Sequence, residues 1–210
     1  MKIIGIETAT EVCGVSFMDS NGTTFCKEEV IPREHARSLP LFFEDMRARM
    51  GCELNEIDGI AISIGPGSFT GLRIGLSYAK GLAYSQGLPI IPVPTLEAMA
   101  SQINCDSQFN VLLFSHRDMI YHQSFSSDGS PNIEVAVSKW SDLEQTLESE
   151  TIYHSNCSKF LQDFDNVQEV KASAENVCAL ALKHFNDWVN NDPYMMVPNY
   201  IAPFELNTPK

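Results

Sequence analysis

The order of apolar segments along this chain repeats. Short runs typical of strands and longer runs with helical spacing follow one another as three strands, a helix, a strand, a helix, a strand and a helix. This order occurs in residues 2–100 and again, more weakly, in residues 110–189. The repeat predicts two related α/β lobes, which we expect to comprise residues 1–105 and 106–210 and to be joined near residues 102–109.

Turn and capping residues set the expected boundaries. Asn21-Gly22 between apolar runs is a strong hairpin signal, the Thr95 hydroxyl is expected to cap a short helix, and Ser141 to cap another. The expected strands of the first lobe are Lys2–Glu7, Val12–Met18, Thr23–Val30, Gly59–Ile64 and Pro89–Val93, with helices within Glu34–Met50, after the turn Gly65–Gly71, and from Thr95. Those of the second are Asn110–Ser115, Ile120–Phe125, Ile133–Ser138, Thr151–His154 and Val167–Val170, with helices at Asp142–Glu148, Ser158–Phe164 and Ala174–Val189.

Two lobes of this order, with a first strand running into Glu7-Thr8-Ala9-Thr10, resemble the superfamily of actin, sugar kinases and heat-shock ATPases. The resemblance implies two RNase H-like lobes, each a mixed sheet with flanking helices, and an ATP cleft between them. Fold likeness alone does not carry function over.

The glycine distribution argues against an ATP cleft. Backbone amides approach phosphates closely where side chains are absent, yet 11 of the 12 glycines lie at or before Gly87. The first hairpin of the second lobe, residues 112–123, contains none. The first strand ends in Glu7, where ATPases of the superfamily typically carry Asp. We therefore expect no independent ATPase and no bound cofactor.

The glycine-rich turn after the fourth strand fits no phosphate-binding template. Its residues are Gly65, Pro66, Gly67, Ser68, Phe69, Thr70 and Gly71. It lacks the GK[ST] ending of a P-loop, and its GxGxxxG spacing is one residue too long for a dinucleotide fingerprint. A tight strand-to-helix connection is favoured over a nucleotide site, although any helix N-terminus attracts anions.

The helix that follows combines small residues with apolar ones. Gly71, Gly75, Ala79 and Ala83 recur every fourth position and predict a flat side for close helix packing. A glycine inside a helix costs up to about 1 kcal/mol relative to alanine, so Gly75 and Gly81 need a compensating reason. Arg73, Ser77 and Lys80 form its polar stripe, whereas the stripe of the preceding helix is apolar: Leu39, Phe42, Phe43, Met46 and Met50.

Two interpretations of this helix pair stay open. Packing on the sheet of one monomer explains about half of the pattern, and an intermolecular helix bundle explains the rest. The residues expected at the partner face are Leu39, Phe42, Met46, Leu72, Arg73, Gly75, Leu76, Ala79, Lys80 and Ala83. We expect a Gly75→Leu variant to stay folded but to lose its partner.

Charge and composition restrict the other functions. The net charge is −13, so the surface should repel a nucleic-acid backbone, and any RNA is expected to be held mainly by another protein. Six scattered cysteines, no signal peptide and no membrane-spanning run predict a cytoplasmic protein with reduced thiols. The histidines lack metal-ligand spacing and Ser68 lacks a GxSxG elbow, so we assign no catalytic residue and no metal.

The first half resembles the bacterial TsaB (YeaZ) family. The stretches that carry the resemblance are "IIGIETATEVCGVSF", "PREHARSLPLFFEDM", "IDGIAISIGPGSFTGLRIGLSYAKGLA" and "LPIIPVPTLEAMA". The resemblance implies a non-catalytic paralogue of TsaD in the synthesis of threonylcarbamoyladenosine in tRNA. It implies pairing with TsaD through the first two helices, an ATPase partner, TsaE, and a homodimer when TsaD is absent.

The chain departs from the family in the second lobe. Ser115-His116-Arg117 stands where the family commonly has Asp-Ala-Arg, and Ala202 follows Tyr200-Ile201 where Arg is usual. These departures affect TsaE docking and any nucleotide bound there. The alternative function is a small ATP-dependent kinase or phosphotransferase of the superfamily, and a peptidase is a weaker third.

Overall fold

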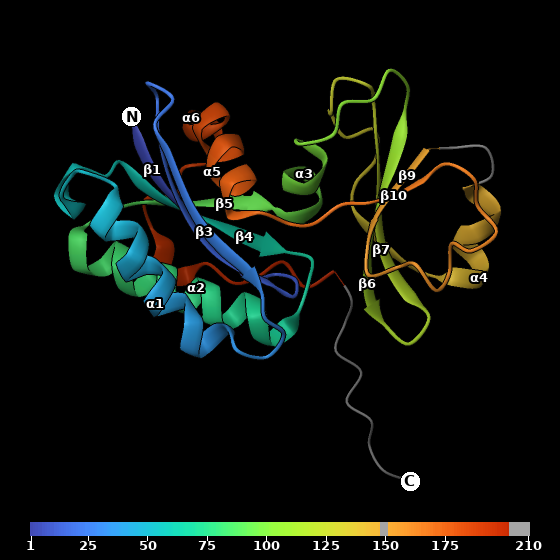
Figure 1. Cartoon of the computed structure of the whole chain (residues 1–210), viewed down its shortest axis with the longest axis horizontal. Coiled ribbons are helices and arrows are strands. Elements are labelled where there is room, and N and C mark those ends of the chain that lie inside the picture. Colours follow the sequence, from blue (N-terminus) through green and yellow to red (C-terminus); the bar gives the residue numbers. More distant parts are fainter. Residues whose placement is uncertain (148–150, 202–210) are drawn as a thin grey trace, which may run out of the picture.

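The computed structural model describes residues 1–147 and 151–201, which form two five-stranded mixed sheets (Figure 1). The first sheet has the order β3-β2-β1-β4-β5. Its strands are β1 (Lys2–Glu7), β2 (Val12–Asp19), β3 (Thr24–Val30), β4 (Gly59–Gly65) and β5 (Ile90–Pro94). β2 pairs antiparallel with β1 and β3, while β4 runs parallel to β1 and β5.

The second sheet repeats this topology. Its order is β10-β9-β6-β7-β8, with β6, β9 and β10 parallel and β7 antiparallel to β6 and β8. The strands are β6 (Phe109–His116), β7 (Met119–Phe125), β8 (Ala136–Lys139), β9 (Thr151–Ser155) and β10 (Val167–Glu169). The predicted two-lobed actin-like fold is confirmed.

Helices cover both faces of the first sheet because successive strand residues point to opposite sides. Ile4 and Ile6 of β1 belong to the core beneath α1 (His35–Arg49) and α2 (Phe69–Gln86). Ile3 belongs to the core on the other face, against α5 (Ala174–Lys183). Figure 1 shows α1 and α2 on one side of the sheet and α5 on the other.

Two helices pack against the sheet that does not immediately precede them in the chain. Helix α3 (Thr95–Ala100) follows the first sheet, but Leu96 and Met99 enter the core of the second, and Figure 1 shows α3 between the sheets. Helix α5 follows the second sheet and packs on the first. The expected division into lobes of residues 1–105 and 106–210 rests on the order of the sequence elements and stays a prediction.

Two expected helices of the second lobe are wrong in extent. Residues 158–164 form successive turns instead of a helix. Phe160 N, for example, donates to Cys157 O, three residues before it. Helix α4 (Trp140–Leu143) begins before Ser141 and is followed by a 3-10 turn (Glu144–Thr146). Residue 148, the expected end of that helix, lies outside the described residues.

Other boundaries also differ from expectation, and β8 begins at Ala136 instead of Ile133. The helix expected over Ala174–Val189 is divided at His184 into α5 and α6 (Phe185–Trp188). The Thr95 hydroxyl does not cap α3, because Pro94 occupies the N-cap position and Thr95 Oγ1 is buried without a hydrogen-bond partner. Short 3-10 turns also lie at Leu54–Glu56 and Pro193–Met195. No described helix is long and apolar enough to cross a membrane.

Candidate partner-binding surface

The glycine-rich turn is packed against the chain's own backbone. A Cβ atom on Gly67 would overlap the carbonyl oxygen of Ala9, and one on Gly71 would overlap that of Thr8. Gly65 has φ of +119°, and a Cβ there would lie 2.6 Å from the carbonyl oxygen of Asn199. Glycine is required at these positions by close approach of the β1–β2 connection and the C-terminal segment. These contacts support the tight-connection interpretation of the turn.

Capping residues at both ends set the bounds of helix α2. The Ser68 hydroxyl accepts a hydrogen bond from Gly71 N at 3.2 Å, and Gly87 closes the helix in the left-handed conformation. Ser68 N also donates to Ala9 O at 2.7 Å, which fixes the start of α2 on the first hairpin.

The small-residue side of α2 faces the sheet and not a partner. Gly71, Gly75, Ala79 and Ala83 are all buried within the monomer. A Cβ on Gly75 would overlap Thr8 Oγ1 and lie 2.9 Å from Ile62 Cδ1. The burial of these residues contradicts the expectation that this side meets another molecule. The close contact at Gly75 also gives a physical reason to expect that Gly75→Leu destabilises the monomer. Thr8 occupies the space that the new side chain would need.

The apolar interface residues predicted on both helices are likewise core residues. Those involved are Leu39, Phe42, Met46, Leu72 and Leu76, none more than 9% exposed. Leu39, Phe42, Met46 and Leu76 pack in the core beneath α1 and α2, because a helix on a sheet buries the stripe that faces it. Of the ten residues predicted at the interface, Arg73 and Lys80 remain accessible.

A different set of α2 residues faces outward. The exposed positions are Thr70, Arg73, Ser77, Gly81, Tyr84, Ser85 and Gln86. Ser77, Gly81 and Ser85 again recur every fourth position. A Cβ on Gly81 would meet no atom within 4 Å, so nothing in the described part of the monomer requires glycine there.

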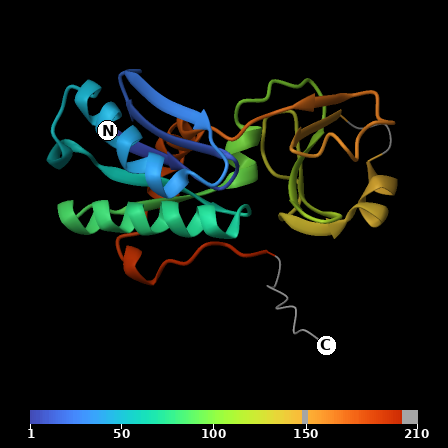
Figure 2. The same ribbon diagram turned by 60° about the horizontal axis from the view of Figure 1, so that its bottom comes forward.

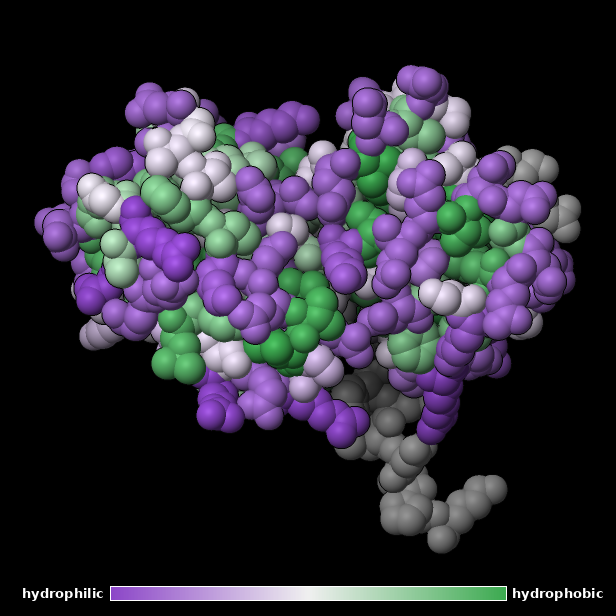
Figure 3. Space-filling view, viewed as in Figure 1, coloured by the Kyte–Doolittle hydropathy of each residue, from purple (hydrophilic) through white to green (hydrophobic). Residues whose placement is uncertain are grey.

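Apolar side chains border this outward side. Ile74, Tyr78 and Leu82 are half-buried, and the ring of Tyr78 meets that of Phe43 on α1 edge-on at 5.7 Å. Tyr84 is 73% exposed and Leu41 on α1 64% exposed. Figure 3 shows apolar atoms gathering at the lower part of the first lobe, where α1 and α2 lie. We call the exposed side of these two helices the α1–α2 face.

The segment from Pro193 to Ile201, here called the tail, lies along the flank of α2 that faces away from α1 (Figure 2). Lys80 Nζ donates to the carbonyl oxygens of Tyr194 and Met196 at 2.8 and 2.7 Å. Arg73 Nε donates to Tyr200 Oη at 2.9 Å. This contact could not be predicted from the sequence, because an irregular segment over 100 residues away carries no periodic signal for it.

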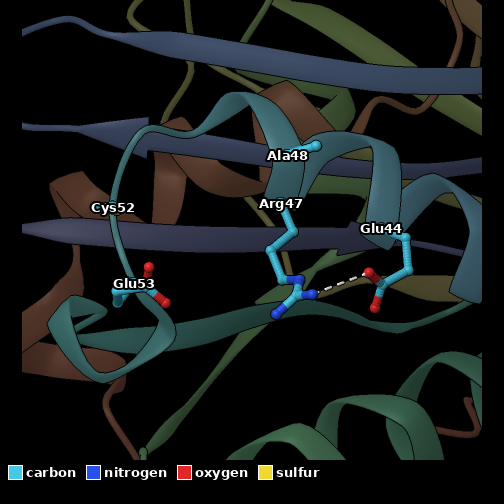
Figure 4. A pocket seen from close by; sticks show the side chains of 5 residues that line it. All are labelled: Glu44, Arg47, Ala48, Cys52 and Glu53. Atoms are coloured by element: carbon cyan, nitrogen blue, oxygen red, sulfur yellow. Dashed lines mark ion pairs between the residues drawn. The ribbon is translucent and has the colours of Figure 1, made fainter.

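A hollow lies at the end of α1, beside the α1–α2 face (Figure 4). It is lined by Glu44, Arg47, Ala48, Cys52 and Glu53, and Arg47 Nη2 lies 3.3 Å from Glu44 Oε2. Both charged side chains are about half exposed, and pairs of this kind contribute about 0–1 kcal/mol. Glu44 and Arg47 therefore neutralise one another in the hollow, whereas Glu53 adds an acidic group.

The carboxyl ends of β1 and β4 hold a buried acid. Glu7 Oε1 accepts from Ala9 N at 2.6 Å, and Ser63 Oγ donates to Glu7 Oε2. Burial raises the pKa of Glu7 to about 7, although these hydrogen bonds act in the opposite direction. Both oxygens are engaged by neighbouring protein groups, so Glu7 braces the first hairpin in this structure.

The first hairpin of the second lobe turns at Arg117, whose φ is +53°. Ser115 Oγ lies 3.0 Å from His116 Nδ1, and Lys159 Nζ donates to Arg117 O at 3.3 Å. The hairpin presents exposed His116 and Arg117 without a glycine. Ala202, the other departure from the family pattern, lies outside the described residues.

Metal-ligating and thiol groups are dispersed. Within residues 1–147 and 151–201, no group of three or more His, Cys, Asp or Glu side chains is placed to hold a metal ion. All six cysteines are unbridged, and burial raises the pKa values of Cys13, Cys157 and Cys178 to about 12.

Comparison with known proteins now identifies the family. Residues 28–182 match the family model "TsaD: tRNA N6-adenosine threonylcarbamoyltransferase". A protein named tRNA threonylcarbamoyladenosine biosynthesis protein TsaB, from Escherichia coli K12, is 43% identical over 100 residues. The chain belongs to the TsaD family, within its TsaB (YeaZ) group. A TsaB from Haemophilus influenzae is 36% identical over 100 residues.

These sequence matches are partial. Both matches cover 48% of this chain. They cover 43% of the Escherichia coli TsaB and 42% of the Haemophilus influenzae TsaB. The chain thus spans less than half the length of the curated relatives that it matches. Partners and role therefore do not follow from the family alone.

The solved structures match over nearly the whole chain. The structure named YeaZ from Pseudomonas aeruginosa has a TM-score of 0.80 at 22% identity, and the match covers 95% of this chain and 99% of that one. A second Pseudomonas aeruginosa protein, described as similar to peptidase YEAZ, has a TM-score of 0.82 at 21% identity, with coverage of 96% and 99%. At these identities the likeness establishes the fold.

Proposed function

We propose that this chain is a non-catalytic scaffold or activator subunit of the complex that forms N6-threonylcarbamoyladenosine in tRNA. In this proposal it pairs with TsaD through the α1–α2 face, and TsaE joins the pair. A homodimer uses the same face when TsaD is absent. Such a role places the protein in the cytoplasm, with tRNA held mainly by its partners because the chain is strongly acidic.

Gly81 is the observation that carries the proposal. An exposed helical glycine costs up to about 1 kcal/mol relative to alanine, and no described group of the monomer approaches closely enough to require it. A partner helix crossing at Gly81 would supply the reason, because the missing side chain lets two backbones approach. Tyr78 and Tyr84 beside it are residue types enriched at the centre of protein interfaces.

The alternative function, an ATP-dependent enzyme of the same fold, has less support. The backbone of Thr8 and Ala9 fills the space beside Gly67 and Gly71, and neighbouring groups engage both oxygens of Glu7. The equivalent hairpin of the second lobe has no glycine for a phosphate to approach. Calorimetry of the purified chain with ATP and magnesium tests this alternative, and tight binding with turnover would favour it.

The pairing is tested with a matched set of glycine variants. Gly81→Leu should abolish co-purification of the full chain with TsaD from the same organism, because a leucine there separates the two helices. Gly81→Ala, the control, adds one methyl group and should retain most of the complex. Thermal unfolding should show that both variants are folded, since the position is open in the monomer.

Two results would count against this model. A Gly81→Leu protein that binds TsaD as tightly as the wild type would place the interface elsewhere. A wild-type chain that fails to bind TsaD would remove the proposed partner altogether.

A further inference from the structure

A pocket between α2 and the tail combines two cations with no acidic residue. It encloses about 250 Å³ and is lined by Arg73, Ser77 and Lys80 from α2 and by Met196, Val197 and Tyr200 from the tail, among others. The chain has 27 acidic residues and 14 Lys and Arg residues, so a pocket of this composition stands out from its average surface. Neither Arg73 nor Lys80 forms an ion pair with a described residue.

Arg73 is held in a fixed orientation. Its guanidinium carbon lies 3.8 Å from the centroid of the Phe69 ring, and its Nε donates to Tyr200 Oη at 2.9 Å. The rings of Phe69 and Tyr200 lie 5.1 Å apart, centroid to centroid. These contacts leave the two terminal nitrogens without a hydrogen-bond acceptor among the described residues. A guanidinium fixed in this way is organised to bind an oxyanion with two parallel hydrogen bonds.

Two more donors lie beside it along the helix. The Ser77 hydroxyl, one turn from Arg73, has no hydrogen-bond partner among the described residues. Lys80 uses two of its three N–H groups on tail carbonyl oxygens, which holds the ammonium at the pocket wall. The pocket therefore combines net positive charge, a fixed guanidinium and a hydroxyl. These groups together suit an oxyanion.

We infer that this pocket is an oxyanion site that takes the carboxylate of an acidic side chain presented by the partner protein. The inference rests on the proposed function for the identity of the partner. Charge complementarity favours this occupant, because the acid-rich remainder of the chain repels a carboxylate and this pocket attracts one. The site would fix the register of the partner along α2, beside the α1–α2 face.

Affinity for TsaD measured by calorimetry on the full chain tests the inference. Arg73→Gln should weaken binding by about 10- to 100-fold, since a hydrogen bond to a charged group contributes about 1.5–3 kcal/mol. Arg73→Lys should lie between this variant and the wild type, because lysine keeps the charge and loses the fork. Lys183→Gln, which removes a charge on α5 at the other face of the sheet, should change affinity less than about twofold.

A second measurement uses the chain alone. Titration with acetate should shift the NMR signals of the Arg73 Nε–H and the Ser77 amide in the wild type. In Arg73→Gln, which lacks the Nε–H, the Ser77 amide should stay unshifted. A parallel titration with inorganic phosphate separates the sources of oxyanion, and shifts with phosphate but not acetate would overturn the carboxylate assignment.

The outcomes separate the inference from the proposed function. Unchanged affinity in Arg73→Gln, with Gly81→Leu still disruptive, would overturn the oxyanion site and leave the helix pairing intact. If the wild type does not bind TsaD, the proposed function fails, and the acetate titration alone decides whether the pocket binds carboxylates.

Discussion

Helix α2 carries small residues on two sides, and the surroundings of the two sides are opposite. Gly71, Gly75, Ala79 and Ala83 face the sheet and are buried. Ser77, Gly81 and Ser85 have the same four-residue spacing and are exposed. Equal spacing therefore corresponds to intramolecular packing on one side and to an open helix face on the other.

The difference lies in what meets each glycine. A Cβ atom on Gly75 would overlap Thr8 Oγ1 of the first hairpin, whereas a Cβ on Gly81 would meet nothing within 4 Å. The glycine at position 75 is explained by the monomer, and the glycine at 81 is not. A small-residue stripe thus indicates close packing, and the tertiary structure determines with what.

The largest expected effect comes from filling the sheet-facing side. Gly75→Leu should lower the free energy of unfolding by at least about 3 kcal/mol, because the new side chain overlaps Thr8 and Ile62. Urea unfolding of the purified variant, or its loss to the insoluble fraction, measures this. A Gly75→Leu protein as stable as the wild type would contradict the packing described for α2.

A double-mutant cycle sharpens the same point. Gly75→Ala should destabilise the wild type more than it destabilises a Thr8→Ala background, because alanine at position 8 removes the hydroxyl that the new methyl group meets. Additive effects would show that Thr8 is not the neighbour that requires glycine.

The hairpin that carries Thr8 should also impose a pH dependence. Burial raises the pKa of Glu7 from its ordinary 4.5 to about 7, so the folded state holds a proton that the unfolded state releases between these values. Stability should therefore fall by about 3 kcal/mol as pH rises from 4.5 to 7. The contribution of Glu7 to this fall should be absent in Glu7→Gln, and urea midpoints of the two proteins across this range measure the difference. Parallel pH profiles would refute the raised pKa.

A substitution on the solvent-facing side of α2 should change the free energy of unfolding in the opposite direction. Gly81→Ala should raise the free energy of unfolding of the monomer by up to about 1 kcal/mol, because alanine is the better helix former and the position is open. Urea unfolding of Gly81→Ala beside Gly75→Ala measures both signs in one experiment. A loss of stability in Gly81→Ala would mean that position 81 is not open as described.

The smallest global effect should come from releasing the tail. Lys80→Met removes two hydrogen bonds to tail carbonyl oxygens and should change global stability by less than about 0.5 kcal/mol. Exchange of the Asn199 amide, which donates to Ile64 O, should become faster, while amides of β1 stay protected. Unchanged exchange at Asn199 would show that Lys80 does not hold the tail.

Much of the fold could be predicted from the chain itself. The expected boundaries of β1 agree fully with the structure, and those of β2, β4 and β6 agree within about two residues, because alternating and continuous apolar runs bounded by turn residues specify strands. Residues 158–164 were predicted as a helix and form turns, since a short apolar segment without caps suits turns as well as a helix. The partner residues were predicted less well, because periodicity gives the apolar side of a helix but not what covers it.

The sequence by itself determined the repeated α/β order, the family resemblance and the need for close packing along α2. The tertiary structure alone decided that Thr8 and Ile62 meet Gly75, that the tail covers the flank with Arg73 and Lys80, and that Gly81 stays open. The physical reason is that local spacing fixes which residues share a side of an element. Which side is buried depends on contacts between segments far apart in the chain, such as the 127 positions that separate Arg73 from Tyr200.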